Sequence, residues 1–244
     1  MKRLVAILLL ALSGCGISED CIQSSGNRIL REVEVPAFDK IMVFPGVSVM
    51  IAQGDEFSAT VEAGENFIED VRVLVADGVL KISEDSGCNW VRKHGDVVVH
   101  VTAPSLTEVY SNTDRDIRSV GTLTYPILRL YAMDTFGGVG TGDFHLSVNN
   151  DLTYVAGNNI AAFYLDGQTD LLSVNFYNDM GRFEGQNLIA NEVEVFHRSS
   201  NDMIVHPVTK LSGNIYSTGN VICVSQPPVV EVVEHYVGRV IYGL

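Results

Sequence analysis

The feature that most constrains the fold is a repeat of about 20 residues in the second half of the chain. After Pro104, seven apolar positions recur at intervals of 18 to 23 residues. A unit of this length cannot bury its own apolar face, whereas stacked units can bury equivalent side chains in ladders. The seven positions are Ile117, Val139, Ile160, Phe183, Met203, Val221 and Val240.

A small residue stands two places before six of these seven positions, and it indicates a tight turn. Gly and Asn are the residues that most readily adopt a left-handed backbone, so we expect positive φ angles there. Each repeat then consists of a strand, a turn and a second strand, which predicts an all-β chain folded as a parallel β-solenoid. An antiparallel sandwich is the alternative. The predicted structural turn residues are Gly137, Asn158, Gly181, Asn201, Gly219 and Gly238, and Arg115 is the exception.

Before the repeats, short strand-like runs are separated by turn residues, and helix signals are nearly absent. Asp77-Gly78 lies between Val71–Val75 and Val79–Ile82, which predicts a hairpin. We expect one domain over 28–244: strands of 28–104 form irregular first coils or a β cap, and 105–244 forms the repeat coils.

The N-terminal segment has the pattern of a lipoprotein signal. Lys2 and Arg3 precede an apolar run from Leu4 to Leu12 that is too short to span a bilayer, and Ser13-Gly14-Cys15 resembles a lipobox. We therefore predict a signal peptide over 1–14, lipid attached to Cys15 that anchors the chain to the outer membrane, and a flexible tether over 15–27.

Charge and cysteine usage narrow the class of partner. The formal net charge is −14, which becomes −16 when the two basic residues of the signal are removed. Such a chain repels phosphates, so no nucleic-acid partner is expected. An envelope location permits disulfides, and Cys21–Cys88 is a candidate pair, with Cys223 left as a buried thiol. Spacing alone does not decide the connectivity.

Several short motifs occur in the order found in a known family. They include Phe38-Asp39-Lys40-Ile41, the Gln53-Gly54 pair, the Asp77–Ile82 hairpin, and Pro104-Ser105-Leu106 before the repeats. With these, the chain resembles the putative auto-transporter adhesin, head GIN domain family of Bacteroidota envelopes. The resemblance implies a right-handed parallel β-helix, and it implies no established catalytic residues.

We predict no catalytic residue and no cofactor. We also predict no metal site, since the six histidines form neither an HxH nor an HExxH pattern. Trp90 is the single tryptophan and a candidate ligand contact. The rival reading is a pectinase-like polysaccharide lyase or hydrolase that would use acids at the turns. Turn residues of a solenoid are often Asp or Asn for backbone reasons, and we prefer that reading. The acids are Asp114, Asp116, Asp134, Asp179 and Asp202.

Together these features predict a lipid-anchored outer-membrane protein that faces either the cell surface or the periplasm. Its body would be a non-catalytic, adhesin-like or glycan-binding platform on which many weak contacts can add. The expected partners are the membrane, through the lipid, and a glycan or surface protein. A purely structural envelope component is a further alternative.

Overall fold

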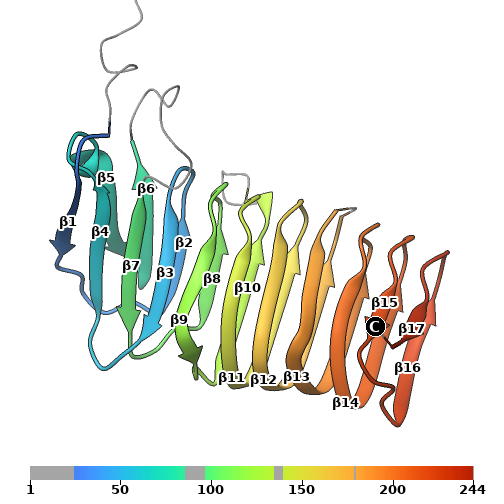
Figure 1. The fold of residues 1–244 in the computed structure, drawn as a ribbon. Helices are drawn as coiled ribbons and strands as arrows, with labels where there is room; N and C mark the ends of the chain where they lie inside the picture. The colour runs from blue at the N-terminus through green and yellow to red at the C-terminus, as the bar shows by residue number, and fades with distance from the viewer. Residues whose placement is uncertain (1–24, 86–96, 135–139, 179, 244) are drawn as a thin grey trace, which may run out of the picture.

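The computed structural model describes residues 25–85, 97–134, 140–178 and 180–243. The chain is all-β, and its stacked parallel strands form a β-solenoid of about six turns (Figure 1). A short 3-10 turn, η2, lies at Ile68–Asp70. The predicted fold class is thus confirmed. No helix among these residues is long and apolar enough to cross a membrane.

In chain order, the described residues form 17 strands. They are β1 (Arg28–Val33), β2 (Lys40–Val43), β3 (Ser48–Gln53), β4 (Ser58–Gly64), β5 (Val71–Ala76), β6 (Val79–Glu84), β7 (Val98–Ala103), β8 (Glu108–Ser111), β9 (Ile117–Leu123), β10 (Ile127–Ala132), β11 (Phe144–Gly157), β12 (Ala162–Phe176), β13 (Arg182–His197), β14 (Met203–Ile215), β15 (Val221–Cys223), β16 (Val229–Glu234) and β17 (Val240–Tyr242).

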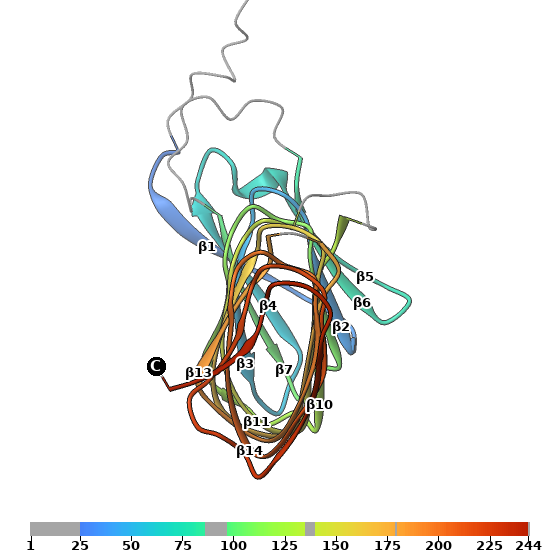
Figure 2. The ribbon, with the colours of Figure 1, turned by 90° about the vertical axis from the view of Figure 1, so that its right-hand side faces the viewer.

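Each coil is flattened, so the solenoid has two broad faces with the core between them (Figure 2). The first face has the order β1-β4-β7-β3-β9, followed by the N-terminal halves of β11 to β14 and then by β15 and β17. The second face has the order β5-β6-β2-β8-β10, followed by the C-terminal halves of β11 to β14 and then by β16. The long strands β11 to β14 bend from one face to the other.

Equivalent side chains stack inside the solenoid because neighbouring coils pair in parallel. The rings of Phe144 and Phe163 lie 4.8 Å apart at 8°, and each buried side chain of this size contributes about 1.5–3 kcal/mol. The main ladder is at most 1% exposed and comprises Ile117, Phe144, Phe163, Phe183, Met203 and Val221.

Two of the seven predicted ladder positions need correction. Ile160 is 56% exposed, and Phe163 occupies the ladder instead. Phe144 holds the position assigned to Val139, which itself lies outside the described residues. The connections between coils differ in length, so a search for a constant spacing selected neighbouring apolar residues.

The left-handed conformation predicted for the turn residues is wrong, although these residues do lie between strands. Asn158, Gly181, Asn201, Gly219 and Gly238 all lack a positive φ, and Gly137 lies outside the described residues. A Cβ atom on Gly219 would lie 2.1 Å from the carbonyl oxygen of Asn201, and one on Gly238 would lie 2.1 Å from that of Gly219. Glycine is therefore needed at these two positions because successive coils approach closely.

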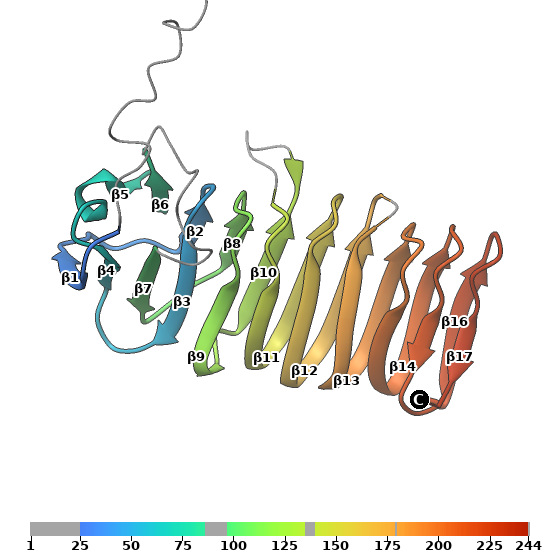
Figure 3. The same ribbon diagram turned by 45° about the horizontal axis from the view of Figure 1, so that its top comes forward.

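The N-terminal strands both extend the solenoid and cover its end. β2 and β3 pair in parallel with β8 and β9 on one side and with β6 and β7 on the other. β4 pairs antiparallel with β1 and β7, and β5 pairs antiparallel with β6, which gives the cap seen from above in Figure 3. The predicted β5–β6 hairpin is confirmed, and Asp77 and Gly78 have the positive φ angles (54° and 75°) of a type I′ turn.

Several predicted residues lie outside the part of the chain that the structure describes: Cys15, Cys21, Cys88 and Trp90. The lipid anchor, the candidate disulfide and the tryptophan contact therefore stay predictions. Cys223 is a buried free thiol, as expected. Its burial raises the thiol pKa to about 11, which makes it a poor nucleophile.

Candidate functional site

A polar groove of about 630 Å³ lies on the first face of the solenoid, and we call it the flank groove. It crosses four neighbouring strands, β9, β11, β12 and β13, and Met50 of β3 borders it. This volume is within the range of small-molecule sites. The groove is lined by Met50, Arg118, Ser119, Gly121, Thr122, His145, Leu146, Ser147, Tyr164, Leu165, Asp166, Glu184, Gln186 and Asn187.

Bulges in the two outer strands frame the groove. Between the pairs Arg118–His145 and Thr122–Ser147, β9 has three residues where β11 has one. On the other side, β13 has two residues, Gly185 and Gln186, where β12 has one. The two inner strands, β11 and β12, pair in continuous register here. Bulges redirect side chains and are common beside binding sites, so this local irregularity shapes the groove.

The floor of the groove carries two stacked rings. His145 on β11 and Tyr164 on β12 lie 4.7 Å apart at 7°. Side chains two residues apart on a strand share a face, so Ser147 and Asp166 also point outward. Tyr164 is 37% exposed. An exposed ring beside a carboxylate and amide groups can bind a ligand with an apolar face and many hydroxyl groups.

The positive charges around the groove are already paired. Arg118 donates a hydrogen bond to Asp116 at 2.6 Å, and Arg182 donates one to Glu184 at 2.5 Å. Burial is the largest cause that lowers the pKa of His145, and Arg118 adds to it, while Asp116 and Asp143 oppose it. His145 is therefore neutral at pH 7. Within the described residues, Asp166 makes no ion pair, so the groove has excess negative charge.

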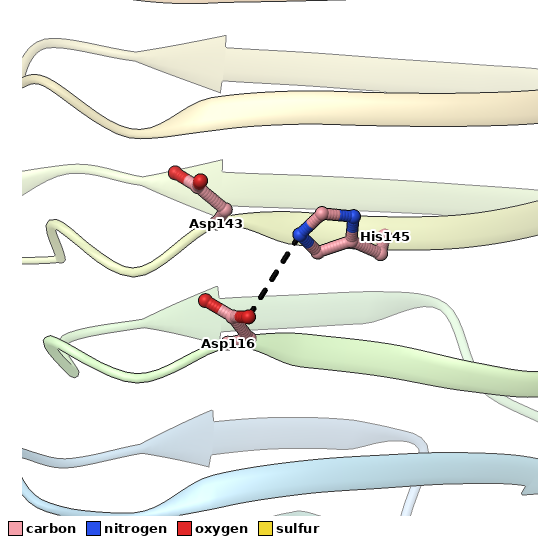
Figure 4. Close-up of side chains that lie close together, drawn as sticks. All are labelled: Asp116, Asp143 and His145. Atoms are coloured by element: carbon pink, nitrogen blue, oxygen red, sulfur yellow. Dashed lines mark ion pairs between the residues drawn. The ribbon is translucent and has the colours of Figure 1, made fainter. Parts of the chain in front are cut away.

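At one end of the groove, His145 meets two carboxylates (Figure 4). Its Nε2 atom lies 3.8 Å from Oδ2 of Asp116, and one ligand atom from each of Asp116, Asp143 and His145 falls within 4.8 Å of the others. Oδ1 of Asp143, however, accepts the backbone N–H of Ala162 at 2.9 Å, and Asp116 holds Arg118. Both carboxylates thus have protein partners, and these contacts are enough to explain why the two acids lie close to His145.

Most of the acids considered for a lyase bond to the solenoid itself. Oδ1 of Asp114 accepts the N–H of Gly46 at 2.9 Å, and Oδ1 of Asp202 accepts the N–H of Asn220 at 2.8 Å. Oδ1 of Asp134 accepts a weak bond from the Asn159 amide at 3.5 Å. Asp179 lies outside the described residues. These acids tie neighbouring coils together, which is a structural role but not the solvated, local turn role expected from the sequence.

The second face carries a row of aromatic side chains along the solenoid, which we call the aromatic ladder. Tyr110 stacks on Tyr131 at 4.8 Å and 11°, and Tyr216 stacks on His235 at 4.2 Å and 5°. Most rings of this row have another ring on both sides, so little free ring face remains for a ligand, which favours a stabilising role over ligand stacking. The ladder comprises Tyr110, Tyr131, Tyr154, Tyr177, Phe196, Tyr216 and His235.

The sequence alone did not indicate the groove. Alternation of apolar and polar residues marks His145, Tyr164 and Asp166 as outward-facing. It does not say which of them are neighbours on adjacent coils, because that depends on the register and on the two bulges. The acid–histidine cluster was missed for the same reason: Asp116 and Asp143 are 27 residues apart in sequence but neighbours across the ladder.

Comparison with known proteins agrees with this fold. The family model described as "Putative auto-transporter adhesin, head GIN domain" matches residues 37–227. A crystal structure of a putative adhesin from Bacteroides fragilis is similar with a TM-score of 0.77 and 19% identity, over 88% of this chain and 97% of that one.

Two further crystal structures are similar. A putative adhesin from Parabacteroides merdae has a TM-score of 0.65 and 16% identity, over 89% of this chain and 96% of that one. A putative lipid binding protein from Parabacteroides distasonis has a TM-score of 0.61 and 16% identity, over 88% and 97%. At these identities the likeness concerns the fold. No curated protein matches the chain.

Proposed function

This chain belongs to the putative auto-transporter adhesin, head GIN domain family, and from that premise we propose that it is a non-catalytic, adhesin-like protein of the outer membrane that binds a glycan in its flank groove. Family membership supports an adhesin-like role at the cell surface or in the envelope. The single observation that supports glycan binding is the pair of stacked rings, His145 and Tyr164, on the floor of a groove rich in hydrogen-bonding groups.

The groove is built on a rigid part of the molecule. Its floor lies on β11 and β12, which pair with each other over 13 residue pairs, and its side chains rest on a continuous core. A site on paired strands keeps its geometry without a ligand, so less conformational freedom is lost on binding. This arrangement suits recognition of a surface molecule.

A non-catalytic role agrees with the chemistry of the groove. Glycoside hydrolysis needs a carboxylic acid that can donate a proton, opposite a second carboxylate. Glu184 is nearly buried and tied to Arg182, so it is not a free proton donor. A hydrolase would therefore have to break this ion pair before it could act.

The lipid anchor at Cys15 is the second part of the proposal, and the lipobox pattern supports it. The described chain starts at the capped end of the solenoid, where β1 pairs with β4. A lipid on Cys15 would thus attach the capped end to the membrane and leave the remaining coils to extend from it.

The proposal is tested on the full chain with two measurements. First, intact cells that express the native protein are treated with protease, with a known periplasmic protein as control, to test exposure at the cell surface. Second, the full-length Cys15→Ser variant is applied to a glycan array and to envelope fractions to test binding. We expect binding to glycans or to envelope fractions that contain them. Absence of binding to every glycan and fraction would contradict the proposed function, and protection from protease until the outer membrane is opened would rule out surface adhesion.

A further inference from the structure

Resting on this proposed function, we infer that the flank groove selects a neutral glycan, with one pyranose ring against Tyr164 and hydroxyl groups on Asp166, Gln186 and Asn187. The inference concerns the chemical class of the ligand and the residues that contact it. It follows from three observations: the stacked floor, the distribution of charge and the hydrogen-bonding groups of the groove wall.

The position of Tyr164 suits a sugar ring. One face of its ring is covered by His145 at 4.7 Å, which fixes the side chain, and the opposite face is turned toward β13. On that opposite side, the neighbouring residue on the next coil is Glu184, whose carboxylate is drawn toward Arg182. The Tyr164 side chain is 37% exposed, so the part of the ring that solvent reaches can contact the C–H groups of a pyranose.

The charges of the groove disfavour an anionic sugar. Both arginines near it are paired, Arg118 with Asp116 and Arg182 with Glu184, and the lowered pKa of His145 keeps that ring neutral. A uronate or sialate would have to displace one of these ion pairs while it faced Asp166. Like charges brought together in a partly desolvated site repel each other, so an acidic glycan binds less well.

A neutral glycan satisfies the polar groups that remain. The Asp166 carboxylate accepts hydrogen bonds, and the side-chain amide of Asn187 both donates and accepts them. The Oε1 atom of Gln186 is buried, so this side chain can pair with a ligand only as a donor through Nε2. Sugar hydroxyl groups also do both, so they can pair with each of these side chains. The groove volume of about 630 Å³ accommodates a short oligosaccharide.

The test compares the affinities of variants of the full-length Cys15→Ser chain for neutral, uronate-containing, sialylated and free-amino glycans, measured by array and then by calorimetry. We expect neutral glycans to bind best. Tyr164→Ala should weaken that binding roughly tenfold or more, whereas Tyr164→Phe, which keeps the ring, should stay close to the parent. Tyr216→Ala on the aromatic ladder is the matched control, since Tyr216 has a similar exposure of 40% on the opposite face.

A charge variant tests the second part of the inference. Asp166→Lys places an unpaired cation in the groove, so it should weaken neutral glycan binding and raise the affinity for uronate-containing glycans. Asp166→Asn keeps one acceptor oxygen and should lose less neutral binding than Asp166→Lys. Circular dichroism and the midpoint of denaturant unfolding confirm that each variant is folded.

The outcomes separate this inference from the proposed function. If the parent chain binds no glycan of any class, the proposed function itself fails. If the parent binds a glycan but prefers an acidic or free-amino class, or if Tyr164→Ala changes binding no more than Tyr216→Ala, then the glycan-binding role stands and the inference is overturned.

Discussion

His197 is a polar residue inside the apolar core, and its burial has a measurable consequence. The side chain is fully buried beside the ring of Phe176, at a centroid distance of 6.5 Å. Burial lowers its pKa to about 4, although the charge of Asp202 and the backbone of Asn220 oppose the shift. The native protein therefore holds a neutral imidazole that resists protonation.

We predict that His197 makes the protein less stable in mild acid. Its pKa is near 6.5 in the unfolded chain and about 4 in the native one, so the unfolded chain binds the proton first as the pH falls. The neutral His197 therefore stabilises the native protein fully above pH 6.5. As the pH falls from 6.5 to 4, the free energy of unfolding decreases by about 3 kcal/mol because of this residue. Denaturant unfolding at pH 7 and pH 4.5 measures this loss. His197→Phe should show a smaller loss, and an equal loss in both proteins would contradict the prediction.

Substitutions at Gly219 test why glycine is needed at the turns: to allow a left-handed backbone, or to let successive coils approach closely. If close approach governs, Gly219→Ala and Gly219→Asn should both lower the free energy of unfolding, by about 1–3 kcal/mol or more, because any Cβ meets the backbone of Asn201. Gly121 is the matched control: its φ is +74°, and a Cβ atom there would have no neighbouring atom within 4 Å. There Asn should be tolerated better than Ala. If Gly219→Asn were clearly more stable than Gly219→Ala, a left-handed backbone at this turn would be supported instead.

At the level of single residues, the sequence pattern picked out the turn glycines correctly but suggested the wrong physical reason for them. Gly219 and Gly238 were recognised as special, yet the cause is close contact with the backbone of the preceding coil, at Asn201 and Gly219. The groove residues Tyr164 and Asp166 gave no signal of their own, since an exposed tyrosine and an exposed aspartate occur on any strand. Only the stacking of coils makes them neighbours of His145 and Gln186.

At the level of strands, alternation separates the two faces of one element sharply. Phe163 and Tyr164 are consecutive on β12, but Phe163 is fully buried against Phe144 whereas Tyr164 lies in the flank groove. Sequence periodicity is enough to predict such alternation. It could not predict the bulges in β9 and β13, because a bulge is defined by its partner strand.

This contrast gives a prediction for β12. Phe163→Ala should lower the free energy of unfolding by about 3–5 kcal/mol, because it removes a stacked ring from the core and leaves a cavity. Tyr164→Ala should cost well under half as much, since its side chain borders solvent. Chemical denaturation of the two variants measures the difference. Similar losses in both would show that Tyr164 is structural and would weaken its use as a ligand-contact variant.

For the molecule as a whole, the repeat was enough to predict a parallel solenoid, and the N-terminal strands were expected to cap it or to form irregular coils. They do both. β2 and β3 complete a coil beside β8 and β9, while β1, β4 and β5 cover the end in antiparallel pairs. The insertion of early strands between later ones leaves no periodic trace in the sequence, which is why the two possibilities could not be separated.

The proposed anchor predicts where the protein is found. Cys15→Ser should move the protein from the membrane fraction to the soluble fraction, because it removes the residue that carries the lipid. Labelling with a fatty-acid analogue should be lost in the same variant. Cys223→Ser, which alters a buried thiol, should keep both the label and the membrane location. Persistent membrane association of Cys15→Ser in a salt wash would contradict the lipid anchor.

The order of the coils also determines how a pulling force would travel. If a ligand binds in the flank groove and the lipid anchors the N-terminal end, as proposed, a pull on the ligand would act on β9, β11, β12 and β13 and would pass through the cap. The hydrogen bonds between coils point along the solenoid axis, so a pull along that axis would act along these bonds and would spread over the four strands beneath the groove. The coils built from β14 to β17 lie beyond the groove, carry none of the tension and can stay intact while the loaded coils stretch.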